Sequence, residues 1–276
     1  STYKFLFVDK TLGSFLTWQF AQFTVLLGFM YLVFPSVWHA QVNRGLLTLL
    51  LTFLALHFLV SVFEFFFHRY VLHLVSIKIL SSFTRKHRKH HSLTPVMKTD
   101  HDSSFRVLND FPIMKAEQRE HSVFPDWAIV GFSLFATPFI FALQWFLPAF
   151  PIILAGYGAV FISYIGYEII HAFEHRSYAE WWKPRIEHPR YGDIWERLYS
   201  FHVMHHANPA CNEAVAGFLG LPVTDWILGT YKRPSKLLLD GVVTNKEDFE
   251  APRGSFIIRA LDRAIGITPK KHEPSN

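Results

Sequence analysis

Ten of the 16 histidines in this chain fall into four short clusters whose spacing is that of metal ligands. The clusters are His68 and His73; His87, His90 and His91; His171 and His175; and His202, His205 and His206. Two of them have the pattern HxxHH, with histidines at i, i+3 and i+4. In a helix these positions share one face, so we expect each motif to present three imidazoles to one small volume. A lone histidine is usually a solvated residue, but four such clusters together indicate a metal site.

The first cluster is the exception, because His68 and His73 are five residues apart. Five residues turn an α-helix about 140° past a full turn, so the two side chains cannot share a face of a regular helix. We therefore expect either that the helix ends between them or that they bind different metals. A break in the helix is the simpler of the two expectations.

The number of histidines bears on the identity of the metal. Ten imidazoles exceed the four ligands of a closed zinc site, whereas two metals with five or six ligands each would use them all. We expect a binuclear site with two iron ions, because imidazole suits iron and iron carries redox chemistry. Zinc could replace iron in the isolated protein. The single cysteine, Cys211, excludes a CxxC metal or redox motif and an intrachain disulfide.

Two glutamates precede histidines on the same helical faces. Glu64 lies four residues before His68, and Glu168 lies three before His171. A carboxylate near a bilayer is costly unless it has a partner, so both are candidates to accept the outer N–H of a ligand histidine. The alternative is that each is a solvated charge at a helix end. We expect His57, deeper in the same segment, to be a hydrogen-bonded packing residue.

Four long apolar segments must position these clusters. Half of the residues are hydrophobic and only 18% are charged, which is typical of a multi-pass membrane protein. Each segment is long enough, at about 1.5 Å per residue, to cross a hydrocarbon core of roughly 30 Å. The sequence predicts an all-α integral membrane protein of one domain, residues 1–276, in which a four-helix transmembrane bundle carries a cytosolic, histidine-rich helical cap. The expected spans are residues 15–35, 45–68, 127–147 and 150–171, and the expected cap is residues 69–126 and 172–276.

Orientation follows from the basic residues. Lys and Arg number two before the first span, one in residues 36–44, ten in 69–126, none in 148–149 and 14 from 172 onward. The positive-inside rule predicts that both termini and all four histidine clusters are cytoplasmic. The net charge of +5 is then explained by orientation and by anionic headgroups rather than by nucleic acid. Residues 255–267 are expected to form a short amphipathic helix that packs at the membrane face.

These motifs together resemble those of the fatty acid hydroxylase and sterol desaturase superfamily of membrane di-metal oxygenases. The resemblance covers residues 45–233 and implies iron, dioxygen, a four-span bundle with a cytosolic cap, and ligand roles for the ten histidines. It also makes Glu174 and Asn212 candidates to support the ligands. The gap between His68 and His73 is similar to that in fatty acid 2-hydroxylases. The matching segments are HRYVLH (68–73), HRKHH (87–91), HAFEH (171–175), HVMHH (202–206) and an ending with Asn208-Pro209, Asn212 and DWILGTY (225–231).

The chain departs from that subfamily in two ways. Nothing within these 276 residues resembles a cytochrome b5 domain, and the 26 residues between His175 and His202 look like a long insertion. The insertion is expected to form a lid or an interfacial helix. It contains His188, which with His101 is a weak candidate for an additional ligand.

The function expected from the resemblance is hydroxylation of a lipid C–H bond, on a fatty acyl or related chain, by dioxygen and two irons. Electrons must come from another protein, such as a cytochrome b5-like protein, a ferredoxin or a reductase, because nothing here resembles a flavin, nicotinamide or iron–sulfur site. Desaturation uses the same oxidant, so lipid or sterol desaturation and carotenoid, sterol or ether-lipid hydroxylation remain alternatives. A histidine-rich metal transporter or sensor is the non-enzymatic alternative. The membrane is expected to be a bacterial inner membrane or the endoplasmic reticulum.

Overall fold

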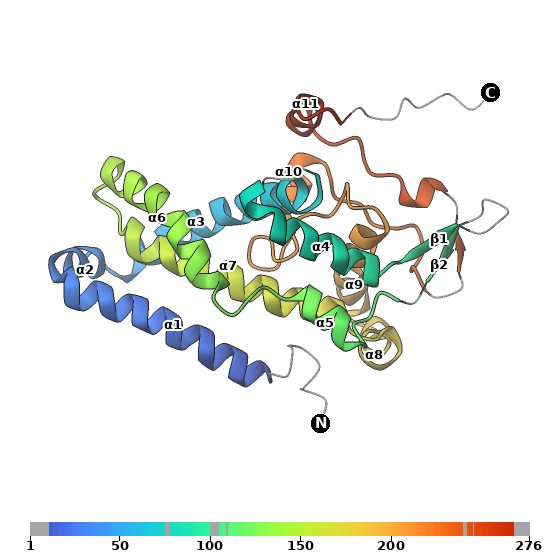
Figure 1. The fold of residues 1–276 in the computed structure, drawn as a ribbon, viewed down its shortest axis with the longest axis horizontal. Coiled ribbons are helices and arrows are strands. Elements are labelled where there is room, and N and C mark those ends of the chain that lie inside the picture. The colour runs from blue at the N-terminus through green and yellow to red at the C-terminus, as the bar shows by residue number, and fades with distance from the viewer. Residues whose placement is uncertain are drawn as a thin grey trace.

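Four long helices account for the apolar segments of the chain (Figure 1). Each is long and apolar enough to cross a membrane, so the described residues contain four candidate membrane-spanning helices at the predicted places. The structure is a computed structural model, and it describes residues 11–74, 78–99, 105–108, 110–239, 242–244 and 246–267. The four helices are α1 (Leu12–Val33), α3 (Leu46–Phe66), α6 (Ala128–Phe146) and α7 (Ile152–Glu174).

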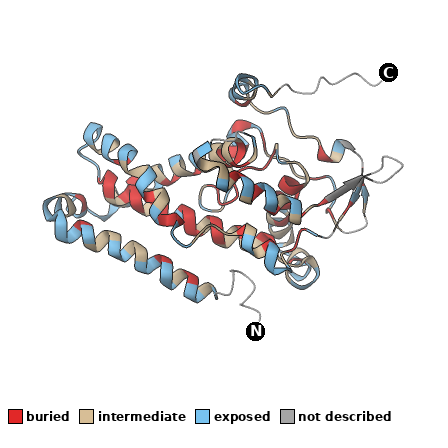
Figure 2. Cartoon of the chain, in the orientation of Figure 1, coloured by how far each residue is buried: buried red, intermediate tan, exposed pale blue. Residues whose placement is uncertain are grey.

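Helix α7 is the centre of this bundle. About two thirds of its span is buried, against less than a fifth for each of the other three, and Figure 2 shows the contrast with the largely exposed α1. Small residues allow this, because they let neighbouring helices approach closely. A side chain added at Gly156 would meet Ile140 of α6, and one added at Gly158 would meet Phe53 of α3. Helices α3 and α6 therefore both pack on α7.

The amino-terminal end of α7 is held by glutamines of neighbouring elements. The short helix α2 (Pro35–Val42) follows α1, and its Gln41 side-chain oxygen accepts the N–H groups of Ile153 and Leu154. Gln144 of α6 donates to the chain at Phe150 and accepts from Ile152. These bonds satisfy N–H groups that a helix leaves unpaired in its first turn.

The remaining helices lie around and beyond the carboxyl-terminal end of α7 (Figure 1). Alongside two short 3₁₀ segments, η2 (Lys78–Leu80) and η4 (Lys246–Phe249), they form the region predicted as the cap. The helices are α4 (Ser81–Leu93), α5 (Ala116–Ser122), α8 (Lys183–Ile186), α9 (Gly192–Ala207), α10 (Val223–Leu228) and α11 (Phe256–Ala264).

The prediction of an all-helical chain is wrong in one place. A small antiparallel sheet in the order β1-β2-β3 pairs Met97 with Val107 and Phe105 with Thr244. Its strands are rich in the β-branched residues Val and Thr that suit extended backbone. The strands are only two or three residues long, and the third strand is more than 130 residues away from the second in the sequence. No local sequence pattern therefore predicts them. The strands are β1 (Met97–Thr99), β2 (Phe105–Val107) and β3 (Val243–Thr244).

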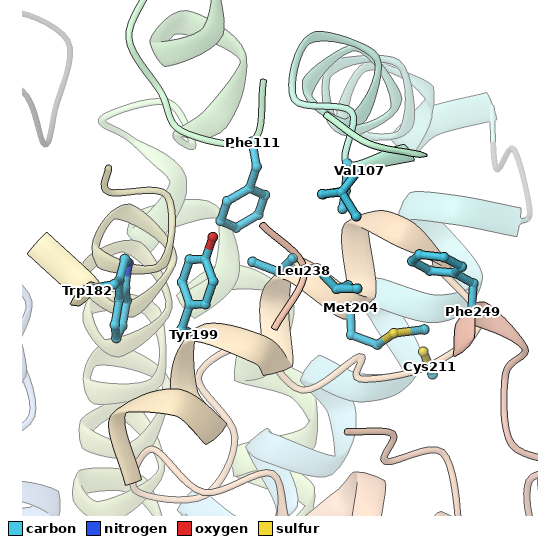
Figure 3. Close-up of a cluster of buried hydrophobic side chains, with 10 residues drawn as sticks. Val107, Phe111, Trp182, Tyr199, Met204, Cys211, Leu238 and Phe249 are labelled. Carbon is cyan, nitrogen blue, oxygen red and sulfur yellow. The ribbon is translucent and has the colours of Figure 1, made fainter. Parts of the chain in front are cut away.

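An apolar core packs against α9 (Figure 3). Tyr199 and Met204 project from α9 into this core, where they meet Phe111, Trp182 and Phe249. Trp182 belongs to the segment expected to form a lid or an interfacial helix, which folds as a π-helix, η3 (Tyr178–Trp182), followed by α8. Because Trp182 is only 3% exposed, this part of the segment serves as packing for the cap.

Candidate metal centre

The helix that carries His68 and His73 does not break between them. Helix α3 continues directly into a π-helix, η1 (Phe67–Leu74). In a π-helix the hydrogen bonds run between residues five apart, so residues five apart lie about one turn apart on the same side. His68 and His73 therefore reach the same cluster of imidazoles. Both expectations drawn from their spacing, a broken helix or two different metals, are wrong.

All ten clustered histidines come together in two groups of five. Within each group the candidate ligand nitrogens lie within 4.8 Å of one another. We call them the first group (His68, His73, His87, His91 and His205) and the second group (His90, His171, His175, His202 and His206).

The two HxxHH motifs are shared between the groups, contrary to the expectation that each serves one volume. On α4, His87 and His91 enter the first group and His90 enters the second. On α9, His205 enters the first group, while His202 and His206 enter the second. Positions i+3 and i+4 differ by about 100° around a helix, so one motif can face two centres on either side of it. The rings of His91 and His206 stack at 4.0 Å, so the groups are neighbours.

The nitrogens of the first group converge on a common point. The Nε2 atom of His87 lies 2.9 Å from that of His68, 3.0 Å from that of His73 and 3.1 Å from that of His91. His205 joins them through a distance of 3.1 Å between its Nε2 and that of His73.

The second group has the same character. Its Nε2 atoms approach to 3.2 Å between His171 and His90 and to 3.0 Å between His202 and His175. The remaining member, His206, has a buried Nε2 with no hydrogen-bond partner among the described residues. Every member of this group is buried.

Hydrogen bonds to the outer nitrogens decide which nitrogen faces inward. The Nδ1 atoms of His205 and His175 lie 2.9 Å and 2.7 Å from the carbonyl oxygens of Cys211 and Phe111. His68 makes the same kind of bond to the carbonyl of Glu213. A carbonyl oxygen only accepts, so in these rings Nδ1 carries the hydrogen and the Nε2 lone pair points into the group.

Lone pairs that converge in this way could be held together by a cation. One N–H at His87 could donate to only one neighbour, yet three Nε2 atoms lie within hydrogen-bonding distance of it. The spacing agrees with metal coordination, because two imidazoles at about 2.1 Å from one ion and at right angles are about 3.0 Å apart. The residues therefore fit one metal ion in each group, and the histidines could hold two ions in all.

Burial keeps these imidazoles in the form that binds metal. Outside the spans, desolvation lowers the pKa of His87, His90, His202 and His206 well below 6.5, and the neighbouring imidazoles lower it further. The pKa of His175 falls to about 3, again through burial. The side chains are therefore neutral at physiological pH, as metal ligands must be.

Two of the four predicted supporting residues do not contact histidines. Glu64 accepts the backbone N–H groups of Ala216 and Gly217, and Glu168 accepts that of Phe124. The backbone groups that bond to each carboxylate belong to loops that come close to the helix of that glutamate only when the chain is folded. Their predicted role of accepting a ligand N–H is therefore not found among the described residues.

Asn212 supports the centre indirectly. Its side chain donates to the carbonyls of Phe201 and Lys232 and accepts the N–H of Lys232, which anchors the loop after α9. That loop supplies the Cys211 carbonyl to His205.

Carboxylates beside the ligands come from Glu174 and from Glu213, which sequence reasoning missed. Glu174 places an oxygen 3.6 Å from Nδ1 of His202, and neither atom has a hydrogen-bond partner among the described residues. Glu213 places one oxygen 3.7 Å from Nδ1 of His68 and 3.9 Å from that of His205. Its place next to Asn212, in the segment matched after the last histidine cluster, was the only available signal.

Asp225, the first residue of the DWILGTY segment, explains why Glu213 is so well placed. Its two oxygens accept the N–H groups of Glu213 and Ala214, both at 2.9 Å, and the hydroxyl of Thr230. The segment thus fixes the backbone of the loop that carries Glu213.

The other histidines under consideration lie apart from both groups. His188 is exposed, and its Nδ1 accepts the N–H groups of Arg190 and Tyr191. His101 is outside the described residues. His57 is a buried packing residue, as predicted, bonded to the Ser163 hydroxyl at 2.8 Å and to the N–H of Leu219.

An apolar cavity of about 320 Å³ runs along α7 between α3 and α6. One end is formed by Glu64, His68 and Leu72, at the edge of the first group, and the other by Leu143 and Ile152. Tyr167 and Ile152, both in its wall, are 15 residues apart on α7, which is about 22 Å of helix.

A second, much smaller cavity of about 20 Å³ lies beside this space, next to the histidines. It is lined by His87 of the first group and by His90 and His171 of the second. Leu72, Phe124 and Tyr167 line both cavities. The long apolar cavity therefore ends beside the two histidine groups.

Searches with this chain found no matching protein family, no matching curated protein and no matching solved structure.

Proposed function

We propose that this protein is a membrane-bound di-iron oxygenase that hydroxylates a C–H bond of a lipid, using dioxygen and electrons from another protein. The observation that carries the proposal is the pair of neighbouring groups, each with five neutral imidazoles aimed inward. Ten nitrogen ligands in two adjacent sets suit two metals of higher coordination better than the closed four-ligand sites of structural zinc. Two iron ions held there would supply the activation of dioxygen.

The long cavity supports a lipid as the substrate. Its walls are almost wholly apolar, and its narrow, elongated form would fit a hydrocarbon chain with one end beside His68. Leu59, Phe135 and Phe139 line the cavity and are also exposed, so it opens sideways between α3 and α6. In a bilayer that opening would face the hydrocarbon core, and a lipid chain could enter without passing through water.

The protein's own part in the reaction would be to position the chain and to keep water out. Leu72, Phe124 and Tyr167 stand between the long cavity and the small one. They are placed to hold the reacting carbon close to the first group while shielding the histidines from solvent. A dry site would protect reactive intermediates from side reactions.

Electrons have to be supplied by a partner such as a cytochrome b5-like protein, a ferredoxin or a reductase. A single cysteine cannot hold an iron–sulfur cluster, and the sequence carries no dinucleotide-binding motif. We propose that the partner approaches from the cytoplasm, in a bacterial inner membrane or in the endoplasmic reticulum, because 24 of the 27 Lys and Arg residues lie in the segments 69–126 and 172–276.

A metal transporter is less well supported. Transport would need ligands near the middle of the bilayer and a polar path between the two faces. The ten histidines instead gather at one end of α3 and α7, and the cavity leading away from them is apolar.

The test is to express the protein with an electron-donor system, measure iron per chain, and compare lipid extracts by mass spectrometry. The parent should bind about two irons and yield oxygenated lipids, and His87→Ala and His205→Ala should abolish the product. His188→Ala is the matched control, because His188 is exposed and outside both groups. If both ligand variants yield the same oxygenated lipids as the parent, the proposal fails. The product also separates hydroxylation from desaturation, since only the former adds oxygen.

A further inference from the structure

A buried arginine joins the first histidine group to the C-terminal helix. Arg69 is 5% exposed, and its guanidinium donates to Glu213 at 3.0 Å, to the carbonyl of Ala210 at 2.9 Å and to Asp262 of α11 at 2.8 Å. The other oxygen of Asp262 accepts the hydroxyl of Tyr70 at 2.9 Å. The planar guanidinium can span these partners at once, which a lysine ammonium could not do with the same geometry.

Glu213 lies between Arg69 and two histidines of the first group. It is fully buried, and one oxygen faces Arg69 while the other lies near Nδ1 of His68 and of His205. The second oxygen has no hydrogen-bond partner among the described residues, so only its bond to Arg69 and its own backbone orient the carboxylate. The Nδ1–H groups of His68 and His205 already donate to the backbone carbonyls of Glu213 and Cys211, so this carboxylate acts on the two rings through its nearby negative charge, which raises the basicity of their inner nitrogens.

The second group is built differently. Its carboxylate, Glu174, lies beside His202, and in the described part of the chain no Lys or Arg forms an ion pair with it. The carboxylate beside the first group is therefore paired with a cation, Arg69. Arg69 itself is held by two carboxylates from distant segments, those of Glu213 and Asp262.

Contacts of Ser255 and Ile258 hold α11 in place and so position Asp262. Ser255 caps the helix by accepting the N–H of Ile258, and the Ser255 N–H donates to the carbonyl of Leu228 at 2.7 Å. Ile258 is 2% exposed and packs with Leu228 and with Phe65 of α3. Ile258 and Asp262 are four residues apart and share a face, so the apolar contact directs the carboxylate at Arg69.

We propose that Asp262 is a positioning residue for the first histidine group, acting through Arg69 and Glu213 on His68 and His205. The proposal rests on the metal binding in the proposed function, and it assigns a role in the metal centre to a helix that contributes no ligand. Without the Asp262 carboxylate, Arg69 keeps a single anionic partner and can turn away from Glu213. The Glu213 carboxylate then loses its orientation, and the first group binds metal more weakly, while the second group is unaffected.

The experiment compares Asp262→Asn with Tyr70→Phe in purified full-length protein. Tyr70→Phe is the matched control, since it removes the other hydrogen bond to Asp262 and leaves the bond to Arg69. Loss of a residue behind the ligands typically weakens metal binding by about 10- to 100-fold. In a competition titration with a metal chelator, Asp262→Asn should lose one of its two ions at a chelator concentration about 10- to 100-fold lower than the parent requires. Tyr70→Phe should match the parent. Asp262→Glu, which restores the charge, should recover most of the affinity.

Cobalt(II) loading supplies a readout that a loss of stability alone would not change. The optical bands of cobalt report ligand geometry, so Asp262→Asn should alter the bands of one ion and leave those of the other. If Asp262→Asn does not fold, Arg69→Lys replaces it, with the same expectation. Two ions held with parental affinity and unchanged bands, in whichever of the two variants folds, would overturn the inference alone. A parent protein that binds no metal would overturn both this inference and the proposed function.

Discussion

Narrowing the far end of the long cavity should shift the preferred length of the substrate chain. Gly156 lines that end, and a Cβ atom there would lie 3.0 Å and 3.1 Å from two side-chain atoms of Ile140, which also lines it. Gly156 is 11 residues from Tyr167, so a plug at this point would leave about 16 Å of the roughly 22 Å of cavity measured along α7. Gly156→Val should therefore exclude only the chains that extend past that level.

The size of the effect follows from the burial of methylene groups. Each methylene displaced from the cavity costs about 0.8 kcal/mol, which is about fourfold in kcat/KM, and three displaced methylenes amount to roughly 50-fold. Chains that end before Gly156 should react at the parental rate. The assay is competition among lipids of graded chain length, with products counted by mass spectrometry.

Gly158→Val is the control for this experiment. It places the same side chain on the same helix, but toward Phe53, at an ordinary contact distance of 3.7 Å, and Gly158 does not line the cavity. Overpacking against Ile140 should cost about 1–3 kcal/mol of stability, so thermal unfolding is measured in parallel, and Gly156→Ala provides a milder step. A folded Gly156→Val protein with the parental chain-length profile, or the same shift in both valine variants, would refute the assignment of the cavity to the substrate.

Three further predictions concern stability and orientation. Burial lowers the pKa of His90, His202 and His206 below 6.5, so the folded metal-free protein binds fewer protons than the unfolded chain. Its Tm should therefore be level above about pH 7 and fall as the pH drops below 6.5. A Tm that rises on acidification would contradict this. His57→Phe leaves the Leu219 N–H and the Ser163 hydroxyl without their partner, so it should cost about 1–3 kcal/mol in the free energy of unfolding but leave metal content unchanged; loss of metal would show that His57 serves the centre. The distribution of Lys and Arg predicts a cytoplasmic C-terminus, so a C-terminal green fluorescent protein fusion should fluoresce in bacteria and an alkaline phosphatase fusion should be inactive, with the reverse pattern refuting the orientation.

Much of the site could be predicted from the sequence because its signals are local. Runs of apolar residues long enough to cross a bilayer are visible without any knowledge of neighbours, and α1, α3, α6 and α7 begin and end within a few residues of the expected spans, apart from the π-helical extension of α3. The spacing of the HxxHH motifs likewise marks His87 and His202, with their neighbours, as residues that face a common region. His57 could be separated from the ligands because helical rise alone places it deeper than His68.

The tertiary structure decided how these residues are shared. Whether His90 joins His87 or His171 depends on where α4 lies relative to α7, and a local pattern contains no such information. The π-helix that unites His68 with His73 is a rare conformation that no local pattern predicts. It is accompanied by a contact from another helix, the hydrogen bond from Thr84 to the carbonyl of Val71.

The carboxylates show the same division. Glu64 and Glu168 were placed correctly on their helices, yet their partners are backbone N–H groups of loops that arrive only when the chain is folded. Glu213 has no regular spacing from any histidine, and it reaches His68 across 145 residues because Asp225 and Arg69 hold its loop against the π-helix. Spacing within a helix thus identified the clustered histidines, while long-range packing determined which of the two groups each histidine joins and which carboxylate lies beside it.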